Sequence, residues 1–578
     1  MSFGKTLYAT ENPELFAKFT PLIEEYNKAR EEQIKNYDPE FYAKCKDTVA
    51  PAEQLDSEPI NALQYLEKLL TPSELVIVNE YSIKDLLDKQ LDKKLTAVEI
   101  INAYIKAAII SQFSTNCGMQ FLIPEALSKA KKLDEYLAEH GKLIGPFHGI
   151  PVSLKEQMNY AGKQTSASYV AYLKNIPKES GVTIQILDKL GANFHIRTAQ
   201  PQAIMWLDTG NVITGRTRNP VSTRLSPGGS SGGESACVGS HGSCIGVGSD
   251  IGGSIRAPAA FANIFGLKPT TRRFSLMNGL SGGKGQESIV AVQGPLARSI
   301  EEMEYFTENY LNEGKPWEYD PLCVPIAWNT KVELPKKIRI GVLFDDNLVT
   351  PYPAVTRGME SVVEKLSKAG EDFEIVDLSK YWYSEKEMEE IYTMNIGLYT
   401  CDGNKVQLGM FGESGEPLEK LTRHFLNFDG GVERSVYENR MFNAKRDSLK
   451  VEMFNKFFKG LKLDFILSPT YCGPSEKQEN SLYWGYTSFW NLLDYPNVIF
   501  PSGVVHDDKI DTIDKLAGPL KSNKYEAMVW KKDGKVIYDP KDYIGGPVAL
   551  QLTAERFHDE DAVACVKKIT KVLGIERR

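Results

Sequence analysis

Histidine, cysteine and long apolar runs are all scarce in this chain. Seven histidines among 578 residues leave little material for a Ser-His-Asp triad. Eight cysteines without a CxxC pair do not resemble a disulfide framework. Cys237 and Cys244 lack the further Cys or His at ligand spacing that a zinc site needs. The longest apolar stretches, such as 107–110, are far too short to span a bilayer. We therefore expect no metal site and no transmembrane segment.

The charge balance argues against nucleic acid as a partner. The net charge is −8 and the pI is 5.7, and no basic stripe with interleaved aromatics is present. The first residues, MSFGKTLYATENPELF, lack the apolar run of a secretory signal, and neither end carries a lipidation or address motif. These features predict a cytoplasmic protein.

The hydrophobic pattern predicts an α/β protein. Residues 1–70 are polar and helical in pattern, which indicates an N-terminal helical extension on a main body of 71–578. Two helices are expected between 71 and 111. The remaining elements are expected to be a strand at 149–154, a helix and a strand within 181–199, a strand–helix–strand unit within 339–378 and a strand at 464–471. This alternation predicts a large mixed β-sheet sandwiched between helical layers. Residues 385–460 are expected to be mostly helical and to form a cap or one wall of a cleft.

The most unusual segment is 226–269, in which 11 of 44 residues are glycine and eight are serine. Such a glycine density costs conformational entropy, so a ligand or a reaction must require it. A phosphate cradle is disfavoured because the pattern GxxxxGK[ST] is absent. GGSSG at 228–232 does match the GxSxG nucleophile elbow, but the polar residues 217–227 before it are not the apolar strand that this motif needs. A triad would also have to draw on the few downstream histidines: His241, His424, His506 and His558.

The third explanation makes Ser254 a nucleophile. Residues 244–248 are predicted to form a short strand, 249–254 a sharp turn and 254–266 a helix. Ser254 would then stand at a helix start, where unpaired N–H groups favour negative charge.

The turn itself has the composition of an oxyanion hole. Gly252 and Gly253 allow the backbone amides to converge, and we expect the amides of residues 251–254, from Ile251 to Ser254, to bind an oxyanion. Asp250 and Arg256 flank the turn, and we expect them to brace it as an ion pair.

A serine at pH 7 is a weak nucleophile and needs a base, for which Lys155 is the candidate. It ends the apolar strand at 149–154, where desolvation would disfavour its ammonium form. Alternatively, Lys155 is a strand-end lysine that reaches solvent. Ser230 would relay the proton between the two, because a hydroxyl both donates and accepts. Alternatively, Ser230 and Ser231 are turn residues that cap a helix at 232–239.

Three motifs together resemble the amidase signature family. They are GIPVSLKEQ at 149–157, SPGGSSGGE at 226–234 and GSDIGGSIRAPAAFANIFGLKPT at 248–270. The intervals of 75 residues from Lys155 to Ser230 and 24 from Ser230 to Ser254 are similar to the family's. The resemblance implies a Ser–cis-Ser–Lys triad of Ser254, Ser230 and Lys155, with the cis peptide between Gly229 and Ser230. It further implies hydrolysis of carboxamide bonds through an acyl-enzyme, without a metal or an organic cofactor.

Further segments at 202–220, 481–496 and 542–552 are similar to the fungal acetamidase branch, which includes fatty acid amide hydrolase-like enzymes. The expected substrate is a small-molecule amide with an aliphatic or fatty-acyl group, including N-acyl amines. The alternatives are an acetamidase for small amides only, a glutaminase-type subunit of a tRNA-dependent amidotransferase and an inactive amidase-fold binding protein. A homodimer is compatible with all of these.

The family match places Ile204 and Met205 beside the acyl chain, which predicts an apolar slot. The alternative is that 203–207 is only a buried helix face. No charged residue interrupts 203–207, which favours longer acyl chains. Five aromatic residues could form a second wall of this slot or belong to the core: Tyr483, Trp484, Tyr486, Phe489 and Trp490.

Overall fold

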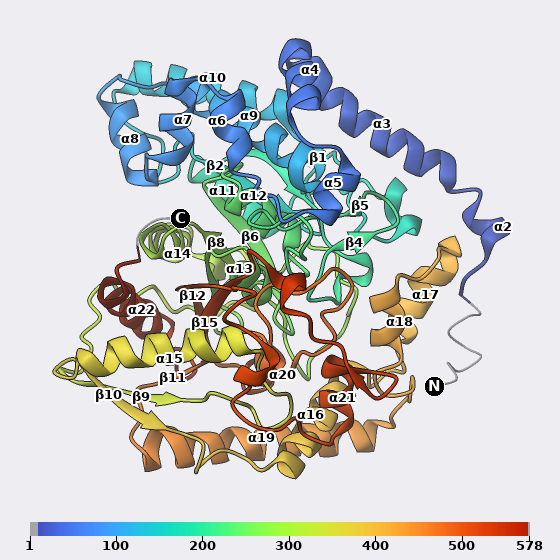
Figure 1. Ribbon diagram of the computed structural model, residues 1–578. Helices are drawn as coiled ribbons and strands as arrows, with labels where there is room; N and C mark the ends of the chain where they lie inside the picture. Colours follow the sequence, from blue (N-terminus) through green and yellow to red (C-terminus); the bar gives the residue numbers. More distant parts are fainter. Residues whose placement is uncertain (1–9, 576–578) are drawn as a thin grey trace.

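The computed structural model describes residues 10–575, and these contain one large mixed sheet of eleven strands (Figure 1). Its strands are β1 (Gly118–Phe121), β2 (Pro151–Lys155), β3 (Asn193–Thr198), β6 (Ile245–Asp250), β7 (Phe265–Lys268), β8 (Val292–Ala297), β9 (Ile338–Val342), β10 (Phe373–Asp377), β11 (Phe465–Pro469), β12 (Asn497–Val505) and β15 (Pro547–Thr553). Two small ribbons are formed by β4 (Gly210–Asn211) with β5 (Gly215–Arg216), and by β13 (Lys531–Lys532) with β14 (Lys535–Val536).

The strand order is β1-β3-β2-β6-β8-β7-β12-β15-β11-β9-β10. β2 runs parallel to both of its neighbours, β3 and β6. β9 likewise runs parallel to β10 and β11, whereas the pairs from β6 to β11 across the middle of the sheet are antiparallel. The predicted mixed sheet is confirmed, and so are the strands expected at 149–154, within 181–199 and 339–378, and at 464–471.

Helices cover both faces of this sheet. The N-terminal helices are α2 (Pro13–Phe16), α3 (Thr20–Tyr37), α4 (Pro39–Thr48), α5 (Ala52–Ser57), α6 (Gln64–Leu69), α7 (Pro72–Asn79), α8 (Ile83–Leu91), α9 (Ala97–Thr115), α10 (Ile123–His140) and α11 (Val182–Lys189). The later ones are α12 (Gly232–Gly239), α13 (Arg256–Phe261), α14 (Ile300–Asn312), α15 (Pro353–Lys368), α16 (Glu385–Tyr399), α17 (Lys405–Ser414), α18 (Lys420–Leu426), α19 (Val436–Met453), α20 (Gly485–Leu493), α21 (Lys524–Trp530) and α22 (Asp559–Leu573). Short 3-10 turns are η1 (Val170–Lys174), η2 (Gln202–Ile204), η3 (Pro316–Glu318), η5 (Ile513–Lys515) and η6 (Pro540–Tyr543), and α19 continues as a π-helix, η4 (Phe454–Gly460).

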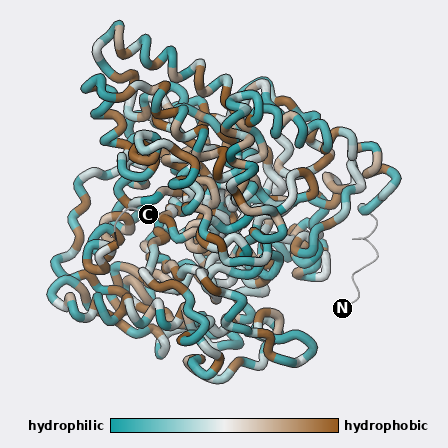
Figure 2. Tube along the Cα trace, turned by 45° about the horizontal axis from the view of Figure 1, so that its top comes forward, coloured by the Kyte–Doolittle hydropathy of each residue, from teal (hydrophilic) through white to brown (hydrophobic). Residues whose placement is uncertain are grey.

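Side chains that alternate in direction along the central strands belong to two separate hydrophobic cores. In β12, Val498 and Phe500 belong to the core that contains α15 and α22, whereas Ile499 between them belongs to the core that contains α13. Because successive side chains of a strand point to opposite faces, these helices cover opposite faces of the sheet. Hydrophobic residues concentrate in the interior and hydrophilic ones along the outer helices (Figure 2). None of the described helices has the length and apolar composition to cross a membrane.

The predicted N-terminal extension is helical where it is described, and residues 1–9 lie outside the described part. Helices α3 to α6 lie along one side of the molecule (Figure 1). Most of their buried side chains, among them Phe41, Leu55 and Leu66, belong to the core that contains α9. Between 71 and 111 the chain forms three helices, not the two expected. The extra boundary arises because the Ser82 hydroxyl accepts a hydrogen bond from the Asp85 amide and starts α8.

The helix predicted at 254–266 is also shorter than expected. It begins at Arg256 and ends at Phe261, and Phe265–Lys268 form strand β7. Asn263 has a left-handed backbone with φ of 60°, which ends the helix and directs the chain into the sheet.

Candidate active site

Lys155 is the last residue of β2, and its side chain is fully buried. Its Nζ donates hydrogen bonds to Ser230 Oγ at 2.6 Å and to Ser249 Oγ at 3.0 Å. Burial lowers the pKa of Lys155 to about 7, although the nearby charges of Asp250 and Glu234 act to raise it. The structure therefore excludes the solvent-exposed alternative for this lysine. A substantial fraction of Lys155 is neutral at pH 7.

Ser230 lies in the tight turn before α12, and the Gly229–Ser230 peptide bond is cis, as the family resemblance implies. A Cβ on Gly229 would lie 1.9 Å from the Asp208 carbonyl oxygen, so only glycine fits there. Ser231 does not cap α12 with its side chain. Its hydroxyl instead donates to the Ser249 carbonyl at 3.2 Å, which attaches the turn to β6. The capping interpretation of Ser231 is therefore wrong.

Ser254 lies in the turn between β6 and α13, two residues before the helix begins. The hydrogen bond from Ala257 N to Gly253 O encloses Ser254 in the turn that leads directly into α13, so Ser254 lies at the N-terminal end of this helix, as expected, but ahead of Arg256, its first helical residue. Its carbonyl accepts from Ser231 N at 3.1 Å, which connects the two serine-bearing turns. Ser254 and Ser230 line the same cavity.

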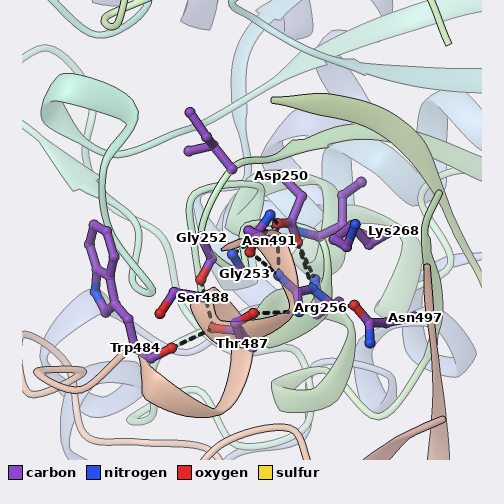
Figure 3. A network of polar contacts seen from close by, with 12 residues as sticks. Asp250, Gly252, Gly253, Arg256, Lys268, Trp484, Thr487, Ser488, Asn491 and Asn497 are labelled. Carbon is purple, nitrogen blue, oxygen red and sulfur yellow. Dashed lines mark hydrogen bonds and ion pairs between the residues drawn. The ribbon is translucent and has the colours of Figure 1, made fainter. Parts of the chain in front are cut away.

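The predicted ion pair between Asp250 and Arg256 is confirmed. Both side chains are fully buried, and Arg256 donates from Nε and Nη2 to the two carboxylate oxygens at 3.0 Å each (Figure 3). Burial alone would raise the pKa of Asp250, but the Arg256 charge and hydrogen bonds hold it well below its usual range. The same carboxylate accepts from the amides of Gly253 at 2.9 Å and Ile255 at 3.0 Å. Asp250 thus organises the whole turn around Ser254.

The backbone amides of this turn therefore differ in whether they are free to bind an oxyanion. The Gly253 amide, expected in the oxyanion hole, donates to Asp250 instead. Among the described residues no acceptor takes the amides of Ile251, Gly252 or Ser254. The Ile251 carbonyl accepts a hydrogen bond from the Tyr399 hydroxyl at 2.5 Å.

Helix α20 supports the turn from behind, a role that the sequence reasoning missed. The Thr487 hydroxyl donates to the Gly252 carbonyl at 2.6 Å, and its own carbonyl accepts from Arg256 Nη1 at 2.8 Å (Figure 3). Asn491 Nδ2 donates to Asp250 Oδ1 at 2.9 Å. The segment 481–496 stood out in the sequence, but no local signal connects it to a turn more than 220 residues away.

A cavity of about 60 Å³ opens beside Ser230 and Ser254. Ile204 and Met205, which the family resemblance places beside the acyl chain, line it together with Ala203. Ala203 and Ile204 have positive φ values of 64° and 61°, so 203–207 is not the regular buried helix of the alternative interpretation. A β-branched residue in the left-handed region is a strained conformation of the kind that gathers at functional sites.

The segment 385–460 is mostly helical, as expected, and contributes Tyr399 and Gln407 to the lining of the cavity. The five aromatic residues at 483–490 are all buried. None of them is among the residues that line this cavity in the described part of the chain, so the core interpretation holds for them.

Comparison with known proteins agrees with this geometry. A family model described as Amidase matches residues 99–563. A solved structure named fatty acid amide hydrolase is 42% identical, with a TM-score of 0.90, and the match covers 98% of this chain and 97% of that one. The acetamidase of Emericella nidulans is 35% identical, over 88% of this chain and 91% of its own length. The acetamidase of Aspergillus oryzae is 32% identical, over 88% and 92% respectively. The chain therefore belongs to the amidase signature family and is an amidase, an enzyme that hydrolyses amide C–N bonds.

Proposed function

We propose that this amidase hydrolyses its substrates through an acyl-enzyme on Ser254, with Ser230 and Lys155 as the proton relay. The observation that carries the proposal is the 2.6 Å hydrogen bond between Lys155 Nζ and Ser230 Oγ, buried beside the cavity that Ser254 lines. A lysine with a pKa of about 7 can accept a proton at physiological pH, which an ordinary lysine cannot.

In the first step Ser254 Oγ attacks the amide carbonyl carbon and gives its proton to Ser230 Oγ, as Ser230 gives its own proton to Lys155 Nζ. The tetrahedral intermediate then expels the amine, and the proton returns through Ser230 to the leaving nitrogen, because an amide anion is a very poor leaving group. Water subsequently attacks the ester carbonyl of the acyl-enzyme and delivers its proton through the same relay. The products are the carboxylic acid, the amine or ammonia, and the restored enzyme.

We assign the oxyanion to the amides of Ile251, Gly252 and Ser254. They belong to one rigid turn and have no acceptor among the described residues. The Gly253 amide supports them indirectly, because its hydrogen bond to Asp250 fixes the path of the turn. A donor held in place before the reaction contributes about 3 kcal/mol of transition-state stabilisation.

For the substrate we propose a short, uncharged acyl group. The cavity volume is about 60 Å³, and a water-sized group needs about 10–15 Å³ by the same measure. A few heavy atoms therefore fit, whereas a fatty acyl chain would require Met205 and Ile204 to move. The resemblance to the acetamidases agrees with a short chain, and the resemblance to the fatty acid amide hydrolase makes the longer chain the competing hypothesis.

The test of this function is covalent labelling combined with turnover. A fluorophosphonate should modify the peptide that contains Ser254, and Ser254→Ala should abolish both the labelling and the release of ammonia from butanamide. Ser448→Ala is the control, because Ser448 is an exposed serine of α19 that does not line this cavity. Labelling of Ser230 with Ser254 unmodified would refute the assignment of the nucleophile.

A further inference from the structure

Gln407 lies in the wall of the catalytic cavity, which Ile204 and Met205 also line. It sits in the first turn of α17, and Met410, Phe411 and Ser414 are the other buried residues of this helix. The spacing of three, four and seven residues places Gln407 on the inward face. Only 4% of Gln407 is exposed, yet it lines the same cavity as Ser230 and Ser254.

The carboxamide oxygen of Gln407 has no hydrogen-bond donor among the described residues, although it is buried. An unpaired buried acceptor is unfavourable, because it has lost its hydrogen bonds to water without gaining others. Such a group in the wall of a catalytic cavity is well suited to bind a ligand.

Two other glutamines line this cavity, and both are held by the protein. Gln157 Oε1 accepts a hydrogen bond from Ser249 Oγ at 3.2 Å. Gln286 donates to the Leu398 carbonyl at 3.0 Å and accepts from the Ser288 amide at 2.9 Å. Gln407 therefore differs from its counterparts in having its acceptor available.

The cavity is lined mainly by apolar surface and offers no unpaired charge. Asp250 is the charged residue among those that line it, and Arg256 pairs with it on both carboxylate oxygens. A charged substrate group would be desolvated there without a counter-charge, at a high cost in free energy. The group that reaches Gln407 is therefore uncharged.

We propose that Gln407 is a specificity-determining residue, whose Oε1 accepts a hydrogen bond from a hydroxyl or N–H group that the substrate carries besides its scissile amide nitrogen. This inference rests on the proposed amide hydrolysis at Ser254. It names the substrate class as short, uncharged amides with one additional hydrogen-bond donor. A site built to bond a donor rejects the analogue that lacks it, because the buried acceptor then stays unpaired.

The test uses pairs of amides that differ only by a hydroxyl in place of a methyl group. On the acyl side the pair is 3-hydroxypropanamide and butanamide, and on the amine side it is N-(2-hydroxyethyl)acetamide and N-propylacetamide. The wild-type kcat/KM should favour the hydroxyl member of at least one pair by about tenfold, the worth of one buried hydrogen bond. In Gln407→Met, which keeps the length of the side chain, this ratio should fall to one or reverse.

Gln286→Met is the matched control, because its amide is already bonded to the protein. This variant should change kcat/KM by the same factor for both members of each pair, so that their ratio stays at the wild-type value. A ratio that is the same in Gln407→Met as in the wild type, for both pairs, would overturn the inference. So would a wild-type preference for the methyl member of both pairs.

Binding to Ser254→Ala separates this inference from the proposed function. Calorimetry on Ser254→Ala and on Ser254→Ala/Gln407→Met should show about tenfold weaker binding of the preferred hydroxyl amide to the double variant. If the hydroxyl amide binds in this Gln407-dependent manner but wild-type protein hydrolyses no amide, the proposed function fails and the recognition by Gln407 stands. If amides are hydrolysed and neither binding nor turnover depends on Gln407, the recognition fails alone. If no amide is bound or hydrolysed, both fail.

Discussion

The hydroxyl of Thr487 donates a hydrogen bond to the carbonyl of Gly252 at 2.6 Å, although the two residues are 235 positions apart in the chain. Gly252 belongs to the turn that carries Ser254, whereas Thr487 belongs to α20. A Cβ on the adjacent Gly253 would lie 2.3 Å from Thr487 Oγ1, and Gly253 has a φ of 134°. The glycine is therefore needed both for its backbone conformation and for the close approach of α20. The geometry of the turn depends on a helix from the far end of the chain.

Thr487→Val should reduce catalysis without unfolding the protein. Valine keeps the shape of threonine but leaves the Gly252 carbonyl without its donor. The loss of one hydrogen bond and a small displacement of the oxyanion amides should lower kcat about tenfold, with a smaller effect on KM. Steady-state kinetics on a short amide measure this. Thr487→Ser retains the hydroxyl and should recover most of the rate, and a wild-type kcat in Thr487→Val would show that the turn holds its geometry without α20.

The pKa of Lys155 predicts the acid limb of the pH profile. Burial lowers it to about 7, and the relay needs the neutral amine. Below that pH the lysine is protonated, so kcat/KM should rise about tenfold per pH unit up to neutrality and then level off. The carboxyl groups that face Lys155 are those of Asp250 and Glu234, and their negative charge opposes the effect of burial. Burial raises the pKa of Glu234 itself to about 8, so Glu234 titrates in the same range as Lys155. The measurement is kcat/KM from pH 5 to 9 on an uncharged amide.

Lys155→Ala should lower kcat by about three orders of magnitude or more, in line with the loss of a general base. Lys155→Arg should not restore it, because the guanidinium stays charged and cannot accept the proton. Circular dichroism confirms that each variant is folded. A rate that is constant from pH 5 to 7 in the wild type would contradict the role of Lys155 as base.

The parts of this site that could be predicted from the sequence are those fixed within one short segment. Residue type and spacing indicate both Lys155, at the end of an apolar strand, and the glycine-rich turn before Ser254. The ion pair expected between Asp250 and Arg256 is also present. Even there, the sequence predicts one oxyanion-binding amide too many, because the amide of Gly253 donates its hydrogen bond to the carboxylate of Asp250.

Contacts between distant segments could not be predicted in the same way. Nothing near Gln407 or Thr487 indicates which turn they face, since that is decided by how α17 and α20 pack around the sheet. The end of α13 at Phe261 was missed for a related reason. A left-handed residue at Asn263 and pairing of β7 with β8 and β12 outweigh the local helical pattern.

Breaking the pair between Asp250 and Arg256 should destabilise the fold as well as the site. Asp250→Asn leaves a fully buried guanidinium without its counter-charge, and Arg256→Met leaves a buried carboxylate, each at a cost of about 3–5 kcal/mol. The double variant should lose less unfolding free energy than the two single variants together, because it contains no unpaired buried charge. Urea unfolding measures these differences.

The pH dependence of this stability has a defined sign. The pKa of Asp250 is held well below its usual range in the folded protein, so its contribution is present above its unfolded pKa of about 3.9. It is lost only as the pH falls through the folded value. The titration of Asp250 itself therefore adds no pH dependence between pH 5 and pH 8. Its charge also raises the pKa of the buried Lys155 and Lys268, which lie at about 7 and about 8, so Asp250→Asn should destabilise the protein more at pH 5, where both lysines are protonated, than at pH 8. A smaller destabilisation at pH 5 would mean that the Asp250 carboxylate is already protonated there.

We expect Ile204 and Met205, which line the catalytic cavity, to limit the length of the acyl chain. Each methylene group that enters the cavity contributes about 0.8 kcal/mol, which is close to a fourfold gain in kcat/KM. A cavity of about 60 Å³ is filled after a few carbons, so kcat/KM from acetamide to dodecanamide should rise, reach an optimum at a short chain and then fall. Met205→Ala removes part of the wall and should move the optimum to longer chains. Met277→Ala, an exposed methionine outside this cavity, should leave it unchanged. If kcat/KM of the wild type instead keeps rising to dodecanamide, Met205 and Ile204 move aside on binding, and the enzyme acts on fatty amides.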